Sequence, residues 1–311
     1  MITAVCAIAR LENHYIREWV NYYISIGFDK IILYDNNEID GENLIDPIKD
    51  YVDSGQLDLI NARGKKGYQV EAYNDCFQKY KDEVDWILFV DIDEFIAFDE
   101  EKPFNIKEFI NSNDKFKNCD IIKFIWSHYT DNDLITVQDN NYSVLKRFTK
   151  KTGRIVANSE YKQIININKK TKQLNMNGVH SVLKKPVPAE TSALIVNDEE
   201  LINSLVILHS DGTAFTGWRG PCFNFQPVVI KHFRYKTLQE YLELKCKRGY
   251  PMPYKNYGQK LDFMEFFIVN NASNEKLDYI YDWLTKCNWD EERIQKAKEE
   301  LEKVKLYYIH K

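Results

Sequence analysis

The first 126 residues alternate short apolar runs with stretches whose apolar residues recur at helical spacing. The helical stretches cover residues 11–26 and 70–80. The runs of strand length show no polar alternation, which is typical of strands covered on both faces. They span residues 3–9, 30–34, 57–60, 86–90 and 120–126. Strand and helix in alternation predict an α/β fold with a mainly parallel sheet and helices on both faces.

Beyond residue 126 the pattern is irregular until helical signals return near the end. Thr237 and Glu240 are spaced as in a capping box, in which each side chain satisfies the other's free backbone donor. An apolar face continues from there to Gly249. The remaining predicted elements are apolar runs at 205–208 and 227–230 and a charged amphipathic helix at 290–305. We therefore expect a helical C-terminal extension.

Length and composition fit a globular chain of 311 residues, 44% hydrophobic and 29% charged. This length accommodates two domains of about 150 residues each, or one α/β domain with an extension. We predict the second arrangement, with a domain over residues 1–230 and a helical region over 231–311. No apolar run reaches the roughly 18 residues of a membrane span, and the N-terminus lacks a secretory signal, so we expect a cytoplasmic protein.

The net charge of −5 conceals an asymmetry. Residues 144–185 hold eleven Lys or Arg against the single acid Glu160, a net +10, and the rest of the chain carries −15. This basic segment favours an anionic partner, although solvated lysine-rich strands and loops give the same pattern. Nucleic acid is not the expected partner, because no recognised helix or RNA-binding motif accompanies the charge.

Three carboxylates directly follow the strongest predicted strand. Asp91 and Asp93 are two residues apart, so their side chains point the same way in an extended chain, and Glu94 comes next. The carboxyl end of a buried strand is where open α/β sheets bind ligands. Oxygen donors suit Mn²⁺ or Mg²⁺, which would stabilise a diphosphate leaving group. A bare D-x-D is also compatible with an acidic turn, although three carboxylates beside a buried strand are costly unless paired or metal-bound.

Several common catalytic motifs are missing from the sequence. There is no G-x-G-x-x-G after the first strand and no G-x-x-x-x-G-K-[ST] loop. Neither H-E-x-x-H nor G-x-S-x-G occurs, and the six cysteines form no C-x-x-C pair. These absences disfavour zinc hydrolases, serine hydrolases and P-loop proteins. They leave metal-assisted diphosphate chemistry without a glycine-rich cradle.

A series of short motifs runs in order through about the first 250 positions. They lie at 9–13 (ARLEN), 17–19 (REW), 34–37 (YDNN), Gln69 with 73–76 (YNDC), 91–95 (DIDEF), Trp126 with Tyr129, Lys162, 179–180 (VH), and 232–236 (HFRYK) with Glu240, Lys245 and Arg248. Their order and spacing resemble GT-A nucleotide-sugar glycosyltransferases, in particular family 92 and the related glycosyltransferase family 2-like group. The resemblance implies a Rossmann-like GT-A domain over residues 1–230 that binds the nucleotide-sugar and the acceptor.

The resemblance also implies a pocket for a nucleotide-sugar donor, with UDP the favoured nucleotide. The residues expected around the base and ribose follow the first two strands and are Arg10, Glu12, Asn13, Asp35 and Asn36. For Asn36 turn formation is equally compatible. The sugar or the diphosphate would be reached by Gln69, Asp91 and Lys66, although Lys66 is equally typical of a solvated loop.

The same resemblance implies a site for Mn²⁺ or Mg²⁺. Asp91 and Asp93 would bind the ion, with Asp93 the stronger candidate for direct coordination. Glu94 would support these ligands or touch the sugar during catalysis. Enzymes of this fold often supply a later histidine, for which His232 is the first choice and His180 the second. A lone histidine at a strand end is also often simply hydrogen-bonded.

An inverting transfer, which the resemblance suggests, needs a general base that deprotonates the acceptor hydroxyl. Asp131, with Asp133 and His128 nearby, is the candidate base, although its sequence context equally favours a turn. The expected acceptor-binding residues are Trp126, Tyr129, His180 and Lys162. The basic segment would contact the diphosphate or an acidic acceptor, such as a lipid-linked saccharide at the membrane face in surface polysaccharide or lipopolysaccharide assembly.

Two other classes of protein stay open at this point. A phosphatase of the haloacid-dehalogenase type also carries D-x-D after a buried strand, with Asp91 as the nucleophile. Against it, two strand-helix units precede the motif here, and Glu94 follows it. The second alternative is a non-catalytic sugar-binding protein of the same fold. Protection by UDP or GDP that depends on Mn²⁺ would distinguish a transferase from both.

Overall fold

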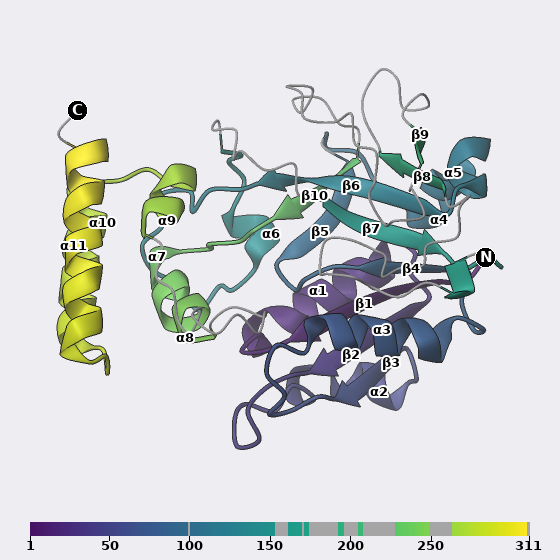
Figure 1. Cartoon of the computed structure of the whole chain (residues 1–311), viewed down its shortest axis with the longest axis horizontal. Coiled ribbons are helices and arrows are strands. Elements are labelled where there is room, and N and C mark those ends of the chain that lie inside the picture. Colours follow the sequence, from purple (N-terminus) through teal and green to yellow (C-terminus); the bar gives the residue numbers. More distant parts are fainter. Residues whose placement is uncertain are drawn as a thin grey trace. The chain divides into compact units, whose positions relative to one another are not determined.

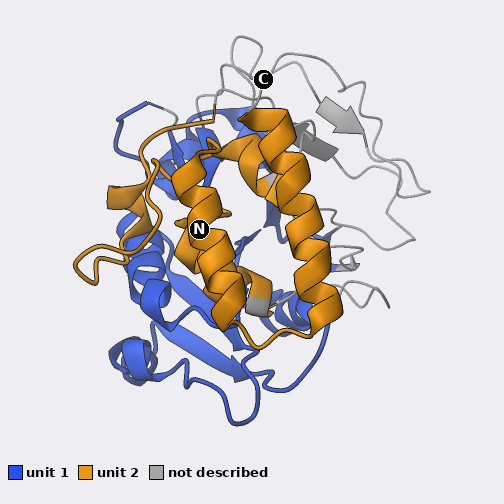
Figure 2. Ribbon diagram, turned by 90° about the vertical axis from the view of Figure 1, so that its left-hand side faces the viewer, with its two compact units in different colours: residues 1–127, 158–232, 251–253 blue, residues 128–157, 233–250, 254–311 orange. Residues whose placement is uncertain are grey.

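The computed structural model of the chain is drawn in Figure 1. It describes residues 1–98, 100–152, 161–169, 171–173, 192–195, 205–207, 228–248 and 263–309. The chain forms two compact units (Figure 2). Unit 1 comprises residues 1–127, 158–232 and 251–253, and unit 2 comprises residues 128–157, 233–250 and 254–311. Each unit therefore joins segments that are far apart in the sequence.

The strands confirm every apolar run predicted from the sequence. They are β1 (Thr3–Ala9), β2 (Lys30–Asp35), β3 (Leu57–Asn61), β4 (Trp86–Phe89), β5 (Glu94–Phe98), β6 (Ile121–His128), β7 (Tyr161–Asn166), β8 (Ser192–Ile195), β9 (Leu205–Ile207) and β10 (Val228–His232). Three of them, β5, β7 and β8, lie outside the predicted runs. Of these three, β5 and β7 carry residues of the candidate site.

The described helices of unit 1 include the two predicted ones, α1 and α3. They are α1 (Asn13–Ser25), α2 (Lys49–Asp53), α3 (Gln69–Tyr80), α4 (Ile106–Asn111) and α5 (Asp114–Asn118), with 3₁₀ turns η1 (Asp46–Ile48) and η2 (Thr171–Gln173). Unit 2 contains α6 (Val144–Arg147), α7 (Leu238–Glu240), the π-helical turn η3 (Tyr241–Lys245), α8 (Cys246–Arg248), α9 (Phe263–Val269), α10 (Asn274–Lys286) and α11 (Glu291–Tyr308). The predicted charged helix near the C-terminus is thus α11.

Eight of the strands follow one another in a mixed sheet in the order β3-β2-β1-β4-β7-β6-β10-β5, and β8 pairs with β6 and with β9. The four strands β3, β2, β1 and β4 are parallel to one another. Strand β7 then pairs antiparallel with both β4 and β6, and β5 pairs antiparallel with β10. The expected α/β class is therefore confirmed, with an antiparallel part added beyond β4. The carboxyl ends of β1, β2 and β4 meet at one edge of the parallel part, which is where such sheets bind ligands.

Helices bury both faces of the parallel strands, as their unbroken apolar sequence predicts. On α1, Trp19 and Tyr23 are fully buried. On α3, Tyr73 and Cys76 pack in one core cluster with Phe89 of β4. The face of the sheet that bears this cluster is called the α3 face below. The cysteines of the described residues are all free thiols.

Unit 2 is held together by buried charge pairs between distant segments. Arg147 makes a bidentate contact with Glu240, with both N–O distances at 2.7 Å. Glu240 also closes the capping box with Thr237, which confirms that prediction. The helix predicted from this cap is divided into α7, η3 and α8, and its expected end at Gly249 lies outside the described residues.

The helices of the described residues are short or strongly charged. The eighteen-residue α11 carries acidic residues in its first turn and Lys305 in its last. Within the described ranges, no helix combines the length and the apolar character that a membrane crossing requires.

Candidate metal and diphosphate site

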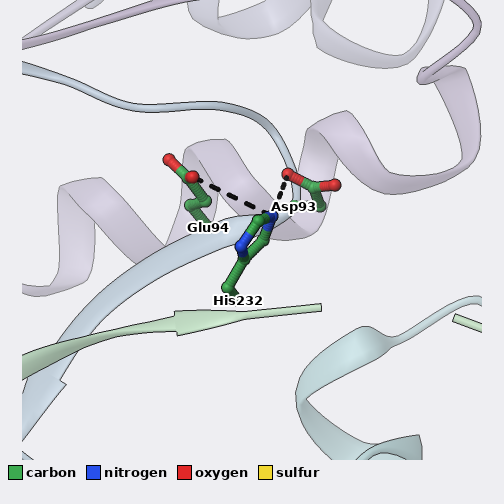
Figure 3. A group of neighbouring side chains, drawn as sticks. All are labelled: Asp93, Glu94 and His232. Atoms are coloured by element: carbon green, nitrogen blue, oxygen red, sulfur yellow. Dashed lines mark ion pairs between the residues drawn. The ribbon is translucent and has the colours of Figure 1, made fainter. Parts of the chain in front are cut away.

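The acidic run leaves the sheet at the carboxyl end of β4 and enters β5 at Glu94. Because β5 pairs antiparallel with β10, Glu94 lies directly opposite His232 in the register. Asp93, one residue earlier, also turns toward the imidazole (Figure 3). Strand pairing thus brings together residues that are far apart in the chain. His232 is the last residue of β10.

Asp93, Glu94 and His232 form a compact group of buried side chains. His232 Nε2 lies 3.6 Å from Asp93 Oδ1 and 3.9 Å from Glu94 Oε1, and one ligand atom from each residue lies within 4.8 Å of the others. Glu94 is 0% exposed, and its Oε1 has no hydrogen-bond partner in the described part of the chain. A buried carboxylate oxygen without a donor is costly unless a ligand completes it.

The carboxylate of Asp91 is held by a different set of partners. Its Oδ2 lies 2.8 Å from Lys162 Nζ, and its Oδ1 accepts hydrogen bonds from Gln69 Nε2 at 2.6 Å and from the Tyr73 hydroxyl at 3.3 Å. Lys162 Nζ also lies 3.3 Å from Glu94 Oε2. The structure therefore groups Glu94, rather than Asp91, with Asp93 and His232, and places Asp91 in an ion pair beside them.

Burial and charge act on the pKa values of this cluster in definite directions. Burial raises the pKa of Glu94, Lys162 opposes that rise, and the carboxylates of Asp91 and Asp93 add to it. For Lys162, burial would lower the pKa, but Asp91 and Glu94 outweigh burial and raise it. Lys162 therefore stays charged and neutralises part of the surrounding negative charge.

Trp126 lies against the cluster rather than away from it. Its ring centroid is 4.2 Å from that of His232, and Lys162 Nζ is 5.8 Å from the centroid of the Trp126 ring. The indole thus covers the imidazole and approaches the ammonium, a geometry in which the ring face attracts a cation. The predicted role of Trp126 in stacking on an acceptor sugar stays a prediction.

Helix α1 supports the backbone of the acidic run through two aromatic side chains. Trp19 Nε1 donates to the carbonyl of Asp91 at 3.1 Å, and the Tyr23 hydroxyl donates to the carbonyl of Glu94 at 3.0 Å. The same hydroxyl accepts from the backbone N–H of Ile96 at 3.3 Å. These hydrogen bonds fix the backbone that carries the carboxylates of Asp91 and Glu94.

Removing the hydroxyl in Tyr23→Phe should lower the free energy of unfolding by about 1–3 kcal/mol, because two buried backbone groups lose their partner. Urea denaturation measures the change. Tyr51→Phe removes an exposed hydroxyl bonded to Asn21 and serves as the matched control, with an expected effect of at most about 0.5 kcal/mol. Equal losses in the two variants would show that the buried Tyr23 hydroxyl stabilises the fold no more than an exposed one.

The residues predicted for the base and ribose gather at the ends of β1 and β2. Asp35 Oδ2 accepts from Arg63 at 2.8 Å, and Asn36 Nδ2 donates to the carbonyls of Ala62 and Lys65 at 2.8 and 2.7 Å. Asn36 thus fastens the following loop, as its turn-forming alternative predicts. The structure brings Asp35 and Asn36 to one edge, and their contact with a nucleotide stays a prediction.

Three further residues predicted to bind the nucleotide-sugar lie at or just before the start of α1. Arg10 pairs with Glu38 at 2.5 Å, and Asn13 donates to the carbonyl of Asn43 at 3.0 Å. Glu12 is buried at the first helical turn. Lys66 is exposed, which fits the solvated loop considered as its alternative. The first three residues therefore share the edge with the ends of the parallel strands.

Two of the residues predicted for catalysis or acceptor binding belong to unit 2. Asp131 Oδ2 pairs with Lys276 Nζ at 2.6 Å, and both side chains are buried. Burial raises the pKa of Asp131, against the effect of Lys276. The ion pair joins two distant segments of unit 2, and the role of Asp131 as the catalytic base stays a prediction. Tyr129 packs its ring on Phe233 at 5.0 Å.

Some of the predicted features lie outside the described residues. His180, the second choice for the metal, is one of them, as is Arg154 of the basic segment. The features that the sequence reasoning missed are β5 and the support from Trp19 and Tyr23. The apolar residues after Glu94 were a signal for β5, because strands are rich in Phe and Ile.

The fold and the site define an α/β protein with a strand-end cluster of oxygen and nitrogen donors suited to a divalent cation and an anionic ligand. The sequence model of glycosyltransferase family 92 matches residues 3–286. The chain belongs to this family, which confirms the resemblance.

Individual relatives match shorter stretches. A glycosyltransferase family 92 protein of rice is 30% identical over 95 residues, which are 30% of this chain and 16% of the rice protein. The galactan beta-1,4-galactosyltransferase GALS3 of Arabidopsis thaliana is 28% identical over 94 residues, 28% of this chain and 18% of that protein. Each match thus covers less than a fifth of the curated relative. The solved structure of S. aureus TarS 1-349 with UDP is 16% identical, with a TM-score of 0.35, and covers 54% of this chain and 47% of that chain.

Proposed function

We propose that this chain transfers a sugar from a nucleotide-diphosphate sugar to a saccharide acceptor, with inversion at the anomeric carbon and in dependence on Mn²⁺ or Mg²⁺. The observation that carries the proposal is the cluster of Asp93, Glu94 and His232 beside the Asp91–Lys162 pair, in a chain of family 92. The name of the Arabidopsis relative makes UDP-galactose the first donor to test.

The donor atoms of the cluster fit a divalent cation. Metal–ligand bonds of about 2.1 Å place neighbouring ligand atoms roughly 3–4 Å apart, and the two distances from His232 Nε2 fall in this range. Two carboxylates and one imidazole suit Mn²⁺ at least as well as Mg²⁺. The free Oε1 of Glu94 supports this assignment, because a cation would complete it.

The charges around the cluster also favour a divalent cation. Three carboxylates against the ammonium of Lys162 leave a formal charge of −2, which a divalent cation balances. When bound, the ion would neutralise negative charge that grows on the leaving diphosphate. Lys162 holds the Asp91 carboxylate through an ion pair, and Gln69 orients the same carboxylate from the other side.

A panel of nucleotide-sugars tests the proposal. We expect UDP to raise the melting temperature of the chain only when MnCl₂ is present, and one UDP-sugar to be hydrolysed or transferred under the same condition. The absence of any nucleotide effect, together with phosphate-ester hydrolysis that Asp91→Asn abolishes, would instead establish the phosphatase alternative.

Arg63 offers a test of the nucleotide pocket. Its guanidinium binds Asp35 and the carbonyls of Ile39, Gly41 and Glu42, so it ties the loop of residues 39–42 to the end of β2. Arg63→Met should raise KM for the nucleotide-sugar about tenfold and leave kcat nearly unchanged, because ground-state and transition-state binding are lost equally. Steady-state kinetics measures both constants.

Arg17→Met is the matched control for this experiment, because Arg17 makes an exposed ion pair with Asp50 on the same unit. Its KM should equal that of the wild type. A fall in kcat with an unchanged KM in Arg63→Met would contradict the assignment of this edge to the nucleotide.

We also propose a lipid-linked or otherwise acidic saccharide as the acceptor, in surface polysaccharide assembly at the cytoplasmic face of a membrane. The net charge of +10 over residues 144–185 supports an anionic partner. Sedimentation with vesicles of anionic lipid, compared with vesicles of neutral lipid, tests the membrane contact. Binding that is equal for both vesicle types would contradict it.

A further inference from the structure

On the α3 face of the sheet, the side chains change from apolar to polar near the carboxyl end of β4, close to the candidate site. In one row across the sheet, Ile87 of β4 pairs with Ile165 of β7, which pairs with Ile121 of β6. Two residues closer to the end of β4, the row consists of Phe89, Gln163 and Lys123. Because side chains alternate along a strand, both rows lie on the same face, and Lys162 points to the opposite one.

Gln163 is a buried amide that finds no partner among the described residues. It is 2% exposed, and neither its Nε2 nor its Oε1 has a hydrogen-bond partner in that part of the chain. Leaving a buried amide unsatisfied is unfavourable, whereas an apolar side chain of similar volume would cost nothing here. A buried amide without hydrogen-bond partners is therefore expected where a bound ligand forms hydrogen bonds with it.

Lys123, the cross-strand partner of Gln163, is a buried cation without a carboxylate. It is 2% exposed, and its Nζ lies 3.0 Å from the Tyr161 hydroxyl and 4.2 Å from the centre of the same ring. No ion pair joins it to an acid of the described residues. Asp91 at the nearby strand end is already neutralised by Lys162. The row therefore holds one ammonium and one amide that can each form further hydrogen bonds. Both lie on the α3 face, as does Tyr73, whose hydroxyl donates a hydrogen bond to Asp91.

We propose that Lys123 and Gln163 form a subsite for an anionic substituent, a carboxylate or a phosphate group, on one of the two sugars of the reaction. The proposal rests on the proposed transferase function. Lys123 would donate to the anion together with the Tyr161 hydroxyl. Gln163 would donate to the anion through Nε2 and accept from a neighbouring sugar hydroxyl through Oε1. The subsite thus selects acidic over neutral sugars.

Isothermal titration calorimetry of the full chain with MnCl₂ tests the subsite in two arms. The donor arm compares UDP-glucuronate with UDP-glucose. The acceptor arm adds glucuronate, glucose 6-phosphate or glucose to protein saturated with UDP. We expect the acidic ligand to bind about tenfold more tightly than the neutral one in one of the arms, as one charge-assisted hydrogen bond allows.

Lys123→Met and Gln163→Leu should each remove this preference and leave the affinity for UDP unchanged. Lys117→Met and Gln78→Leu alter exposed residues of the same unit and should keep the preference. Gln163→Leu should also keep or raise the melting temperature, because it removes an unsatisfied amide. A clear fall in its melting temperature would mean that Gln163 has a structural role, and would overturn the proposal.

The remaining outcomes separate this inference from the function on which it rests. If UDP binds but neither arm shows a preference for the acidic ligand, the subsite is wrong and the transferase proposal stands. If UDP does not bind in the presence of MnCl₂, both proposals fall.

Discussion

Asp93→Asn should abolish Mn²⁺ binding and lower kcat/KM of the proposed transfer about a thousandfold, since a bound metal supplies several kcal/mol of transition-state stabilisation. The substitution keeps the size of the side chain and removes the charge that faces His232. Glu94→Gln should act in the same direction, because its Oε1 is a free carboxylate oxygen of the cluster. Calorimetric titration with MnCl₂ and steady-state kinetics measure the two effects.

Two exposed acids of the same unit provide matched controls. Asp85→Asn and Glu83→Gln change charge by the same amount at positions far more open to solvent. We expect normal Mn²⁺ affinity and normal kinetics for both. Transfer at the wild-type rate by Asp93→Asn in the presence of EDTA would refute the metal assignment, whatever the controls show.

The parts of the fold that depend on local sequence could be predicted. Parallel strands covered on both faces have apolar interiors, so β1, β2 and β4 were evident as runs whose central residues are all apolar. The capping box of Thr237 and Glu240 spans only four residues and needs no tertiary information. The position of the acidic run after β4 followed from the same local pattern.

The parts of the site that depend on long-range pairing could not be predicted. Only the register of β5 with β10 decides that Glu94 faces His232, and a shift by one residue would turn the side chains to the other face. The ion pair between Asp131 and Lys276 joins residues 145 positions apart. The sequence context of Asp131 therefore suggested a base but did not reveal its contact with Lys276.

The greatest loss of stability is expected from Lys162→Met. Lys162 is 1% exposed in its side chain and contacts the carboxylates of Asp91 and Glu94 at 2.8 and 3.3 Å. Removing one partner of a buried ion pair leaves an uncompensated charge and costs about 3–5 kcal/mol at neutral pH. Urea denaturation in the presence of EDTA measures the loss. Lys172→Met, which breaks the exposed pair with Asp82, should cost less than about 1 kcal/mol.

The loss should depend on pH with a definite sign. The pKa of Lys162 is raised by its carboxylate partners against burial, so its contribution is complete at every pH below its unfolded value of about 10.4. In the variant, burial still raises the pKa of Glu94, and the folded state takes up a proton as the pH falls. The difference from the wild type should therefore be smaller at about pH 5 than at about pH 8.

The two cations of the proposed site should compensate for one another. Glu94 directs Oε2 to Lys162 and Oε1 to the cluster with Asp93 and His232, so the ammonium and a metal ion share one carboxylate. Without the ammonium, three carboxylates attract a divalent cation more strongly. MnCl₂ should therefore raise the melting temperature of Lys162→Met by more than that of the wild type. An equal rise in both proteins would show that the two sites are electrostatically independent, and that Lys162 serves Asp91 alone.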